Sequence, residues 1–288
     1  MCINCGCSDD DNNFTILDTN SSIVVGSDLN SNSYNYVLPN KVANTNSNNK
    51  NGHEILGSHT NFYGSTIPLE YTILSKNNLI ASRNRGWLKT HNIIAINLMS
   101  SPGSGKTTLL TRTINDLKNT LVINVIEGDQ ETINDAKKIK DTGCEVIQIN
   151  TGQGCHLDAS MIEGGLEKLN PSPNSLVMIE NVGNLVCPAL FDLGENLRVV
   201  ILSVTEGEDK PIKYPHIFRT SNIMIITKID LLPYVQFDIQ KCIDYAQNVN
   251  PHIRIFQVSS QTRIGLDSWY KLLCNLFNCT PNNTIINT

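Results

Sequence analysis

The sequence has no apolar run of membrane-spanning length and few aromatic or charged residues. Aromatic residues make up 6% and charged residues 17% of the 288 positions, and the formal net charge is −5. An acidic chain without a basic arm or stripe is not expected to bind nucleic acid. The N-terminus also lacks the basic and apolar regions of a signal peptide. We therefore expect a cytoplasmic protein that binds neither nucleic acid nor a membrane.

Cysteine, in contrast, is plentiful. Three of the nine cysteines fall in the first seven residues, MCINCGC, where no apolar segment is available for them to pack against. In a cytosolic chain of this length, clustered cysteines more often bind metal or react than form disulfides. Three later cysteines lie beside apolar runs and are expected in or near the core: Cys144, Cys242 and Cys274.

Composition divides the chain into four parts. Residues 8–66 are rich in Asn and Ser, and such a segment cannot bury enough apolar surface to offset the entropy of ordering. We expect a linker there without stable structure, including its stretch ILDTNSSIVV. The linker separates a metal-binding motif at 1–7 from a folded domain at 67–280, and a tail follows at 281–288. Residues 68–89 have apolar residues at roughly helical spacing and predict one helix leading into the domain.

The domain itself shows a regular alternation. Continuous apolar runs, rather than alternating ones, indicate strands that are covered on both faces. Polar or helical segments separate most of the runs, which predicts a three-layer α/β domain with a mainly parallel sheet. The expected strands are 92–99, 120–127, 145–150, 175–180, 198–204, 222–227 and 253–259.

SSPGSGKTT joins the first strand to a predicted helix, which is the context of a P-loop. Its glycines let successive backbone N–H groups face a phosphate, and the helix dipole adds positive potential. Lys106 is expected to reach the β- and γ-phosphates and Thr107 to bind Mg²⁺. The usual first glycine is Ser100 here. The expected phosphate-binding residues are Gly103, Ser104, Gly105, Lys106, Thr107 and Thr108.

The motif TKID at the end of a later strand indicates that the base is guanine. The carboxylate of Asp230 can accept both N–H groups that guanine presents, while the stem of Lys228 packs along the base. Many GTPases have Asn where this chain has Thr227. The segment VSSQT ends another strand, and we expect backbone N–H groups near Ser259 and Ser260 to face the guanine carbonyl.

Acidic residues at two further strand ends are candidates for hydrolysis. Glu180 ends the strand SLVMIE, and Gly183 could donate its N–H to the γ-phosphate. Glu127 and Asp129 follow the second strand of the domain. Either one could hold Mg²⁺ through water or position the attacking water.

A second group of metal-type residues lies on the same predicted edge. Cys155 and His156 are adjacent in TGQGCHLDAS, and Cys187 follows in NVGNLVCP. Both segments come after strands, so they belong at the carboxyl edge of the sheet with the nucleotide. Three ligands leave a fourth position for water or a second subunit. Spacing alone leaves two alternatives to metal binding open: the cysteines could be core residues, and His156 could cap a helix.

Together, MCINCGC, SSPGSGKTTLL, IEGDQET, TGQGCHLDA, NVGNLVCP and TKIDLLPY closely resemble the HypB family, the GTPases of nickel insertion into [NiFe]-hydrogenase precursors. The resemblance covers about residue 70 to the C-terminal helix, with the N-terminal motif. It implies a SIMIBI-class GTPase that dimerises with GTP, works with the metallochaperone HypA and delivers Ni²⁺ to the hydrogenase large-subunit precursor. The implied ligands, for Ni²⁺ or Zn²⁺, are Cys2, Cys5 and Cys7, and separately Cys155, His156 and Cys187.

Three thiolates at the N-terminus suit a soft-ligand nickel site, whose affinity should fall in acid. Many relatives carry a His-rich stretch after this motif, but this chain has only His53 and His59 there. Other interpretations stay open: a urease-accessory-type GTPase, a nickel or zinc storage protein with vestigial nucleotide binding, and an ATP-dependent kinase. The N-terminal motif argues against the first and TKID against the last, while GTP turnover separates an enzyme from a storage protein.

Overall fold

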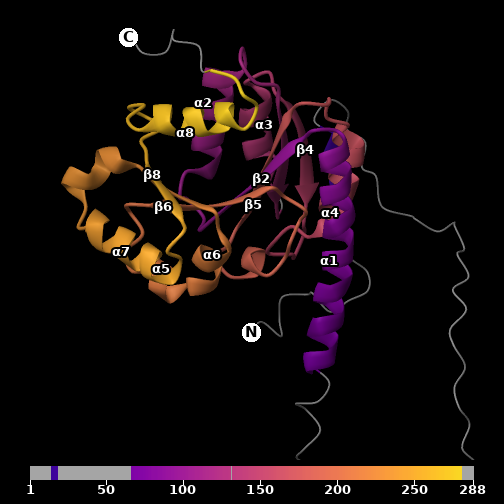
Figure 1. Cartoon of the computed structure of the whole chain (residues 1–288), viewed down its shortest axis with the longest axis horizontal. Coiled ribbons are helices and arrows are strands. Elements are labelled where there is room, and N and C mark those ends of the chain that lie inside the picture. The colour runs from indigo at the N-terminus through magenta and orange to yellow at the C-terminus, as the bar shows by residue number, and fades with distance from the viewer. Residues whose placement is uncertain (1–13, 19–65, 131, 281–288) are drawn as a thin grey trace, which may run out of the picture.

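The computed structural model describes residues 14–18, 66–130 and 132–280 (Figure 1). The motif of Cys2, Cys5 and Cys7 and most of the expected linker therefore lie outside the described residues. The strands are β1 (Thr15–Asp18), β2 (Ile94–Ser100), β3 (Ile123–Asp129), β4 (Glu145–Asn150), β5 (Leu176–Gly183), β6 (Leu197–Ser203), β7 (Ile223–Thr227) and β8 (Arg254–Gln257).

The helices are α1 (Thr66–Thr90), α2 (Lys106–Leu117), α3 (Asn134–Lys140), α4 (Ala159–Leu169), α5 (Lys210–Lys213), α6 (Pro215–Thr220), α7 (Ile239–Val249) and α8 (Leu266–Asn275). Two 3₁₀ turns, η1 (Cys187–Ala189) and η2 (Ile229–Tyr234), follow β5 and β7. The helix predicted over 68–89 is confirmed as α1.

The strands form one sheet in the order β1-β4-β3-β5-β2-β6-β7-β8. Strands β2 to β8 pair in parallel, and β1 alone pairs antiparallel, with β4. All seven predicted strands are present, so the prediction of a mainly parallel α/β sheet is confirmed. The chain leaves β2 toward β3 on one side, while β6 lies on its other side. The loop after β2 thus lies at the switch point where α/β sheets bind ligands.

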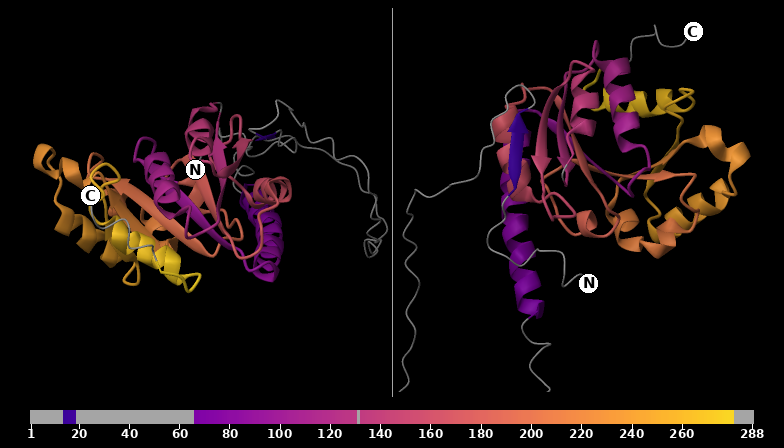
Figure 2. Two further views of the ribbon diagram at one scale, coloured as in Figure 1. Left: turned by 90° about the horizontal axis from the view of Figure 1, so that it is seen from above. Right: turned by 180° about the vertical axis from the view of Figure 1, so that it is seen from behind.

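Helices cover both faces of the sheet, which gives the predicted three layers (Figures 1 and 2). One face packs against α2, α3 and α8 in the largest apolar cluster. On the other face, α1 and α4 cover the half around β3, β4 and β5, and α6 and α7 cover the half around β6 and β7. Cys242 and Cys274 are fully buried and Cys144 packs against the largest cluster, as predicted.

Strand β1 corrects the expectation that residues 8–66 have no stable structure. Thr15–Asp18 extend the sheet at its edge, where Figure 2 shows β1 in indigo. Phe14 and Ile16 pack against the apolar cluster under α4, and the Lys168 ammonium donates to the Ile16 carbonyl at 3.2 Å. The prediction was wrong because average composition hides a short apolar segment, which gains its burial from a distant part of the chain.

Helix α1 contacts the rest of the domain through one buried stripe. From Tyr71 onward, where side-chain burial is described, its buried residues are Asn77, Ala81, Asn84 and Leu88, at the i, i+4, i+7 and i+11 spacing of a single helix face. Two of these four positions are asparagines. The helix is therefore held by polar as well as apolar contacts.

Those two asparagines tie α1 to two loops at once. Asn77 donates to the Asp192 carbonyl at 2.8 Å and accepts from the Ala159 N–H at 2.9 Å. The Asn84 amide donates to the carbonyls of Ala159 and Leu193, at 2.8 and 3.0 Å. Buried backbone groups need such partners, so α1 fixes the start of α4 and the loop after η1 relative to each other.

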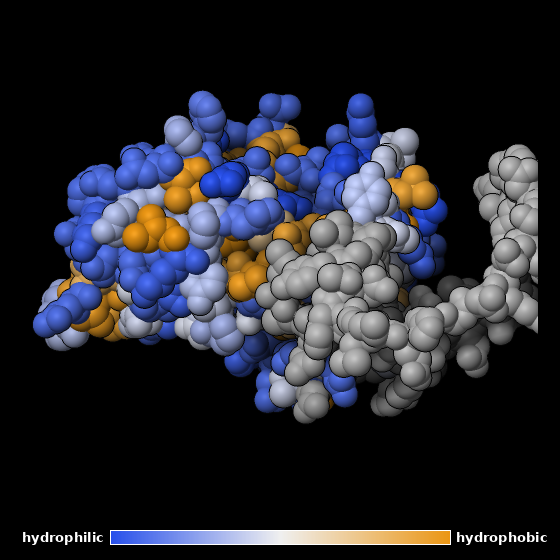
Figure 3. Space-filling model, turned by 90° about the horizontal axis from the view of Figure 1, so that it is seen from below, coloured by the Kyte–Doolittle hydropathy of each residue, from blue (hydrophilic) through white to orange (hydrophobic). Residues whose placement is uncertain are grey.

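The surface shown in Figure 3 is mainly hydrophilic, with apolar side chains in separate groups. Among the described residues, no helix is both long and apolar enough to span a bilayer.

Replacing Asn84 by Ala should lower the free energy of unfolding by about 2–4 kcal/mol, because two buried carbonyls lose their donor. Arg83→Ala is the matched control, since Arg83 lies next to Asn84 on α1 and forms an exposed ion pair with Glu163 of α4. The control should lose less than about 1 kcal/mol. Urea denaturation of both variants measures the difference in the free energy of unfolding. Equal losses of stability would contradict the role of Asn84 as the donor to two buried carbonyls.

Candidate functional site: a nucleotide loop and a metal cluster

The loop between β2 and α2 has the geometry of a phosphate cradle. Gly103 and Gly105 have φ of +75° and +94°, which favours glycine. Gly105 directly precedes Lys106, the first residue of α2, so the loop ends at the positive end of a helix. The predicted P-loop is therefore formed in three dimensions.

Ser100, at the position of the usual first glycine, is accommodated without strain. It is absent from the residues with positive φ, so the backbone there does not require glycine. The buried hydroxyl of Ser100 donates to the Ser101 carbonyl at 2.7 Å and accepts from the Lys106 ammonium at 2.9 Å. The serine thus gives Lys106 a neutral partner near the loop.

Two buried carboxyl groups lie beside the start of α2. The Thr107 hydroxyl donates to Glu180 Oε1 at 2.7 Å. The Oε2 atoms of Glu180 and Glu127 are buried and have no hydrogen-bond partner. Burial, and then the neighbouring Glu180 charge, raise the pKa of Glu127 to about 9. Burial likewise raises the pKa of Glu180. Unpartnered buried acceptors near Thr107 fit a divalent cation.

The carboxylate of Asp129, the alternative candidate to Glu127, already accepts hydrogen bonds from its own loop. Its carboxylate accepts from the backbone N–H groups of Gln130 and Thr132, at 2.8 and 3.0 Å, and from the Thr132 hydroxyl. These contacts assign Asp129 to shaping the loop after β3. Of the two acids, Glu127 has the environment that favours a cation.

Gly183, at the end of β5, lies against the P-loop. It is the register partner of Ser100. A Cβ atom at this position would lie 3.0 Å from Cα, Cγ and N of Pro102. A side chain would therefore push against the loop, and glycine permits this close approach.

The TKID segment also contacts the P-loop directly. The Lys228 ammonium donates to the Gly103 carbonyl at 2.7 Å, and the Thr227 hydroxyl to the Ser104 carbonyl at 2.6 Å. Thr227, which replaces the usual Asn, therefore still braces the loop.

Asp230 is half-buried in η2, and the N–H of its neighbour Ile229 donates to the Val258 carbonyl at 3.3 Å. This bond brings the segment of Ser259 and Ser260 next to TKID. Ser259 is buried, and its hydroxyl accepts from the Thr262 N–H at 3.0 Å. The two segments predicted to recognise the base are thus adjacent.

The predicted metal ligands Cys155, His156 and Cys187 converge. Their ligand atoms all lie within 4.8 Å of one another, and no other group of three metal-type residues is found in the described part of the chain. The His156 ring lies 4.0 Å from the Phe191 ring, centroid to centroid. Burial lowers the pKa of His156, which favours the neutral imidazole that binds metals.

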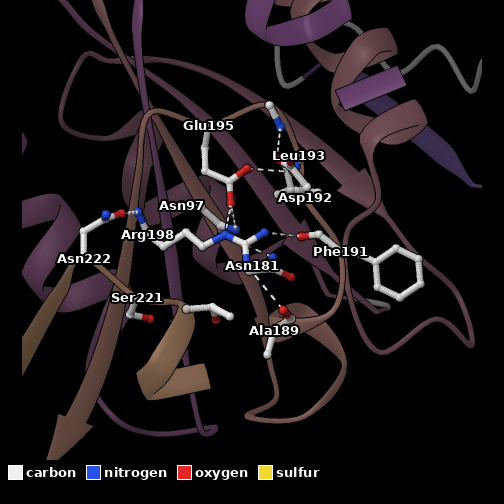
Figure 4. A network of polar contacts seen from close by, with 12 residues as sticks. Asn97, Asn181, Ala189, Phe191, Asp192, Leu193, Glu195, Arg198, Ser221 and Asn222 are labelled. Carbon is white, nitrogen blue, oxygen red and sulfur yellow. Dashed lines mark hydrogen bonds and ion pairs between the residues drawn. The ribbon is translucent and has the colours of Figure 1, made fainter. Parts of the chain in front are cut away.

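A buried polar network links the loop of the predicted metal ligands Cys155 and His156 to β5 (Figure 4). Asn181 follows Glu180 directly, and its side-chain carbonyl accepts from the Leu157 N–H, next to His156, at 3.1 Å. Its amide donates to Asn97 on β2 at 3.2 Å, and the Asn97 amide donates to Glu195 at 3.2 Å.

Glu195 and Arg198 extend this network to the loop that carries Cys187. The Arg198 guanidinium donates to Glu195 at 2.7 Å, and also to the carbonyls of Ala189 and Phe191, at 3.3 and 2.9 Å. Figure 4 shows the guanidinium directed at both carbonyls. The loop from Cys187 to Glu195 is therefore held from inside the domain.

Sequence reasoning missed Asn97, Asn181, Glu195 and Arg198. A polar residue inside an otherwise apolar strand, as in IAINLM, was the available signal. Such residues need buried partners, but the sequence does not show which ones.

Comparison with known proteins agrees with this geometry. Residues 94–257 match the model of the CobW/HypB/UreG nucleotide-binding domain. The chain is 50% identical over 224 residues to hydrogenase maturation factor HypB of Escherichia coli (strain K12), covering 77% of each chain. It is 55% identical over 207 residues to HypB of Rhizobium leguminosarum bv. viciae, covering 72% of this chain and 69% of that one.

Two solved structures are similar over most of their length. The hydrogenase maturation factor HypB of Archaeoglobus fulgidus superimposes with a TM-score of 0.67 at 40% identity, over 71% of this chain and all of that one. HypB of Helicobacter pylori, solved in complex with nickel, gives 0.66 at 37% identity, over 70% and 95%.

Without metal and nucleotide, the stability of the protein should fall as pH rises from about 5 to 9. The folded protein keeps a proton on Glu127 up to a pKa of about 9, whereas the unfolded chain loses it near 4.5. The folded state therefore binds more protons in this window, and the expected slope is about 1 kcal/mol per pH unit or less. Glu127→Gln should flatten the slope and be more stable than the wild type at pH 8. Urea denaturation in EDTA measures this, and identical slopes would refute it.

Proposed function

We propose that this chain, which belongs to the HypB family of hydrogenase maturation factors, hydrolyses GTP with Mg²⁺ and delivers Ni²⁺ to the precursor of a [NiFe]-hydrogenase large subunit. One observation carries the proposal. The P-loop with TKID and the cluster of Cys155, His156 and Cys187 lie at the same edge of one sheet, and β5 contributes to both.

The P-loop residues bind the phosphates of GTP. Backbone N–H groups of Gly103 to Thr108 face the phosphates, and Lys106 turns from the Ser100 hydroxyl to the β- and γ-phosphates. Thr107 and Glu180, with Glu127 through water, would hold Mg²⁺. When bound, this ion neutralises charge on the phosphates.

Guanine is recognised by the strand ends on the other side of the loop. Asp230 accepts from the two guanine N–H groups, and the Lys228 stem, fixed over Gly103, packs on the base. The N–H groups near Ser259 and Ser260 donate to the guanine carbonyl. The carboxylate acceptor distinguishes guanine from adenine, which presents a different pattern of donors.

Hydrolysis is slow in the isolated protein. The Gly183 N–H senses the γ-phosphate next to Pro102. The loops after β2, β3 and β5 contain no arginine that could stabilise the transition state. An arginine that stabilises the transition state raises the rate of GTP hydrolysis about 10³–10⁵-fold. A partner is therefore needed for faster turnover.

The cluster of Cys155, His156 and Cys187 binds nickel as cargo, and zinc competes for the same ligands. Its three protein ligands leave a position for a transferring ligand. Val186 and Leu190, which flank Cys187, are 53% and 47% exposed. This apolar rim supports a GTP-dependent homodimer and the docking of a HypA-like metallochaperone. The chain and this metallochaperone meet in the cytoplasm.

The purified protein should hydrolyse GTP slowly and only with Mg²⁺, and Lys106→Ala should abolish the activity. Lys118→Ala is the matched control, because Lys118 is an exposed lysine at the end of the same helix. It should leave turnover unchanged. Phosphate release measures the rates. Hydrolysis of ATP at a rate comparable to GTP would show that the base assignment is wrong.

Nickel should bind to two separable sites. Replacing both Cys155 and Cys187 by Ser should remove one equivalent, and deleting residues 1–7 should remove the other. The deletion should leave GTP turnover nearly unchanged, because the nucleotide contacts all lie within residues 100–262. Equilibrium dialysis with nickel measures the stoichiometry. An unchanged nickel stoichiometry in the double Ser variant would show that Cys155 and Cys187 do not bind nickel.

A further inference from the structure

The segment predicted to recognise the base is folded tightly onto the end of β8. The Ser259 N–H donates to the Ile264 carbonyl at 2.9 Å and closes a loop. At Gly265, where φ is +78°, a Cβ atom would clash with the Gln257 carbonyl oxygen, so only glycine fits. We call residues 259–265 the base loop. Its two ends are fixed to each other and to the strand.

Two backbone N–H groups in the middle of the base loop are available to a ligand. The Thr262 N–H donates within the loop, to the Ser259 hydroxyl at 3.0 Å. The N–H groups of Ser260 and Gln261 form no hydrogen bond with any other residue that the structure describes. Two adjacent donors suit a carbonyl oxygen, which can accept two hydrogen bonds. A guanine carbonyl is recognised only if the loop holds these donors in place.

Arg263 ties the base loop to helix α2. Its guanidinium donates from Nη2 to Asp116 Oδ1 at 2.6 Å, and the Tyr270 hydroxyl of α8 donates to Oδ2 of the same carboxylate at 2.9 Å. Burial raises the pKa of Tyr270, which therefore stays a donor. Arg112 lies 3.4 Å from the same carboxylate. The Asp116 side chain is only 7% exposed, so these contacts are largely shielded from water.

Both residues of the Asp116–Arg263 pair are in locally unfavourable places. Asp116 lies in the last turn of α2, where the negative end of the helix dipole disfavours a carboxylate. Arg263 has a φ of +69°, a left-handed conformation that is unfavourable for a residue with a Cβ atom. The ion pair offsets both effects. Without it, Arg263 is free to leave this conformation, and the base loop turns with it.

Helix α2 connects this pair to the phosphate site. Lys106 and Thr107 begin the helix and Asp116 lies near its end. The backbone between them is hydrogen-bonded at every turn, so the distance between the two ends is fixed. One helix therefore sets the position of the P-loop and, through Arg263, of the base loop.

We propose that Asp116 is a positioning residue for guanine recognition. Through Arg263 it holds the base loop so that the N–H groups of Ser260 and Gln261 donate to the guanine carbonyl. This role rests on the GTP-binding function proposed above. Asp116 itself does not touch the nucleotide. Its loss weakens the contact with the carbonyl and leaves the contacts with the phosphates and with Asp230 in place.

Two nucleotides that differ in a single atom test this role. In 6-thioguanosine 5′-diphosphate, sulfur, a weaker acceptor, replaces the carbonyl oxygen of GDP, and both N–H groups for Asp230 remain. Each nucleotide displaces a fluorescent guanine nucleotide from the full-length protein with Mg²⁺, which gives two dissociation constants. The wild type should bind GDP at least about fivefold more tightly than the thio analogue. In Asp116→Ala the two dissociation constants should agree within about twofold.

Two further variants separate positioning from a general loss of stability. Arg263→Gln should lose the preference for GDP as Asp116→Ala does. Because the Arg263 side chain is 37% exposed, this variant carries the test if Asp116→Ala does not fold. Thr113→Val is the matched control: the Thr113 hydroxyl accepts from Trp269 Nε1 at 3.1 Å and so also joins α2 to α8. This contact does not involve the base loop, so the control should keep the wild-type preference.

The outcomes distinguish this role from the function on which it rests. A wild-type preference for GDP retained in Asp116→Ala and in Arg263→Gln would overturn the role of Asp116, and so would an equal loss of preference in Thr113→Val. Equal binding of GDP and the thio analogue by the wild type would also overturn it, because the base loop would then not contact the carbonyl. Binding of ADP as tight as that of GDP by the wild type would instead refute the proposed guanine specificity itself.

Discussion

The alternation of side chains along β5 is the constraint on which both sites depend. Successive residues of a strand face opposite sides of the sheet. Glu180 therefore faces α2 and accepts from Thr107, and Asn181 faces the opposite layer and accepts from the Leu157 N–H. Gly183 then ends the strand against Pro102. One strand thus carries both the end that lies against the P-loop and the support of the loops with the candidate metal ligands, so a shift of β5 moves both.

The polar network around Asn181 makes that connection stiff. Asn97, Asn181 and Glu195 are nearly inaccessible to solvent, and each has hydrogen-bond partners. Breaking one bond leaves a buried group unpaired, which costs about 1–3 kcal/mol. Movement of the loops of His156 and Cys187 together with β5 keeps these hydrogen bonds, whereas separate movement of one loop would break them. Joint movement therefore costs less free energy. Helix α1 adds a second restraint, through Asn77 and Asn84, on the same two loops.

The parts predicted from sequence are those with local signals. The P-loop follows from Gly103 to Thr107 between a strand and a helix, and the convergence of Cys155 with Cys187 follows from two strand ends in a parallel sheet. β1 and the Asn181 network could not be predicted, because each depends on partners far away in the chain. Ile16 is half-buried against a cluster whose residues all lie more than 70 positions away, and Asn181 is satisfied only when β2 and the loop after β4 are in place.

Nickel affinity in two nucleotide states tests the central claim, that β5 couples the phosphate site to the metal cluster. Nickel is titrated into the chain lacking residues 1–7, with GDP and with a non-hydrolysable GTP analogue, in the wild-type domain and in Asn181→Leu. Coupling of this kind is typically about 1–3 kcal/mol, so the two affinities should differ about 5–150-fold. In Asn181→Leu the ratio should approach one while GTP still binds. Equal nickel affinity with both nucleotides in the wild-type domain would contradict the account.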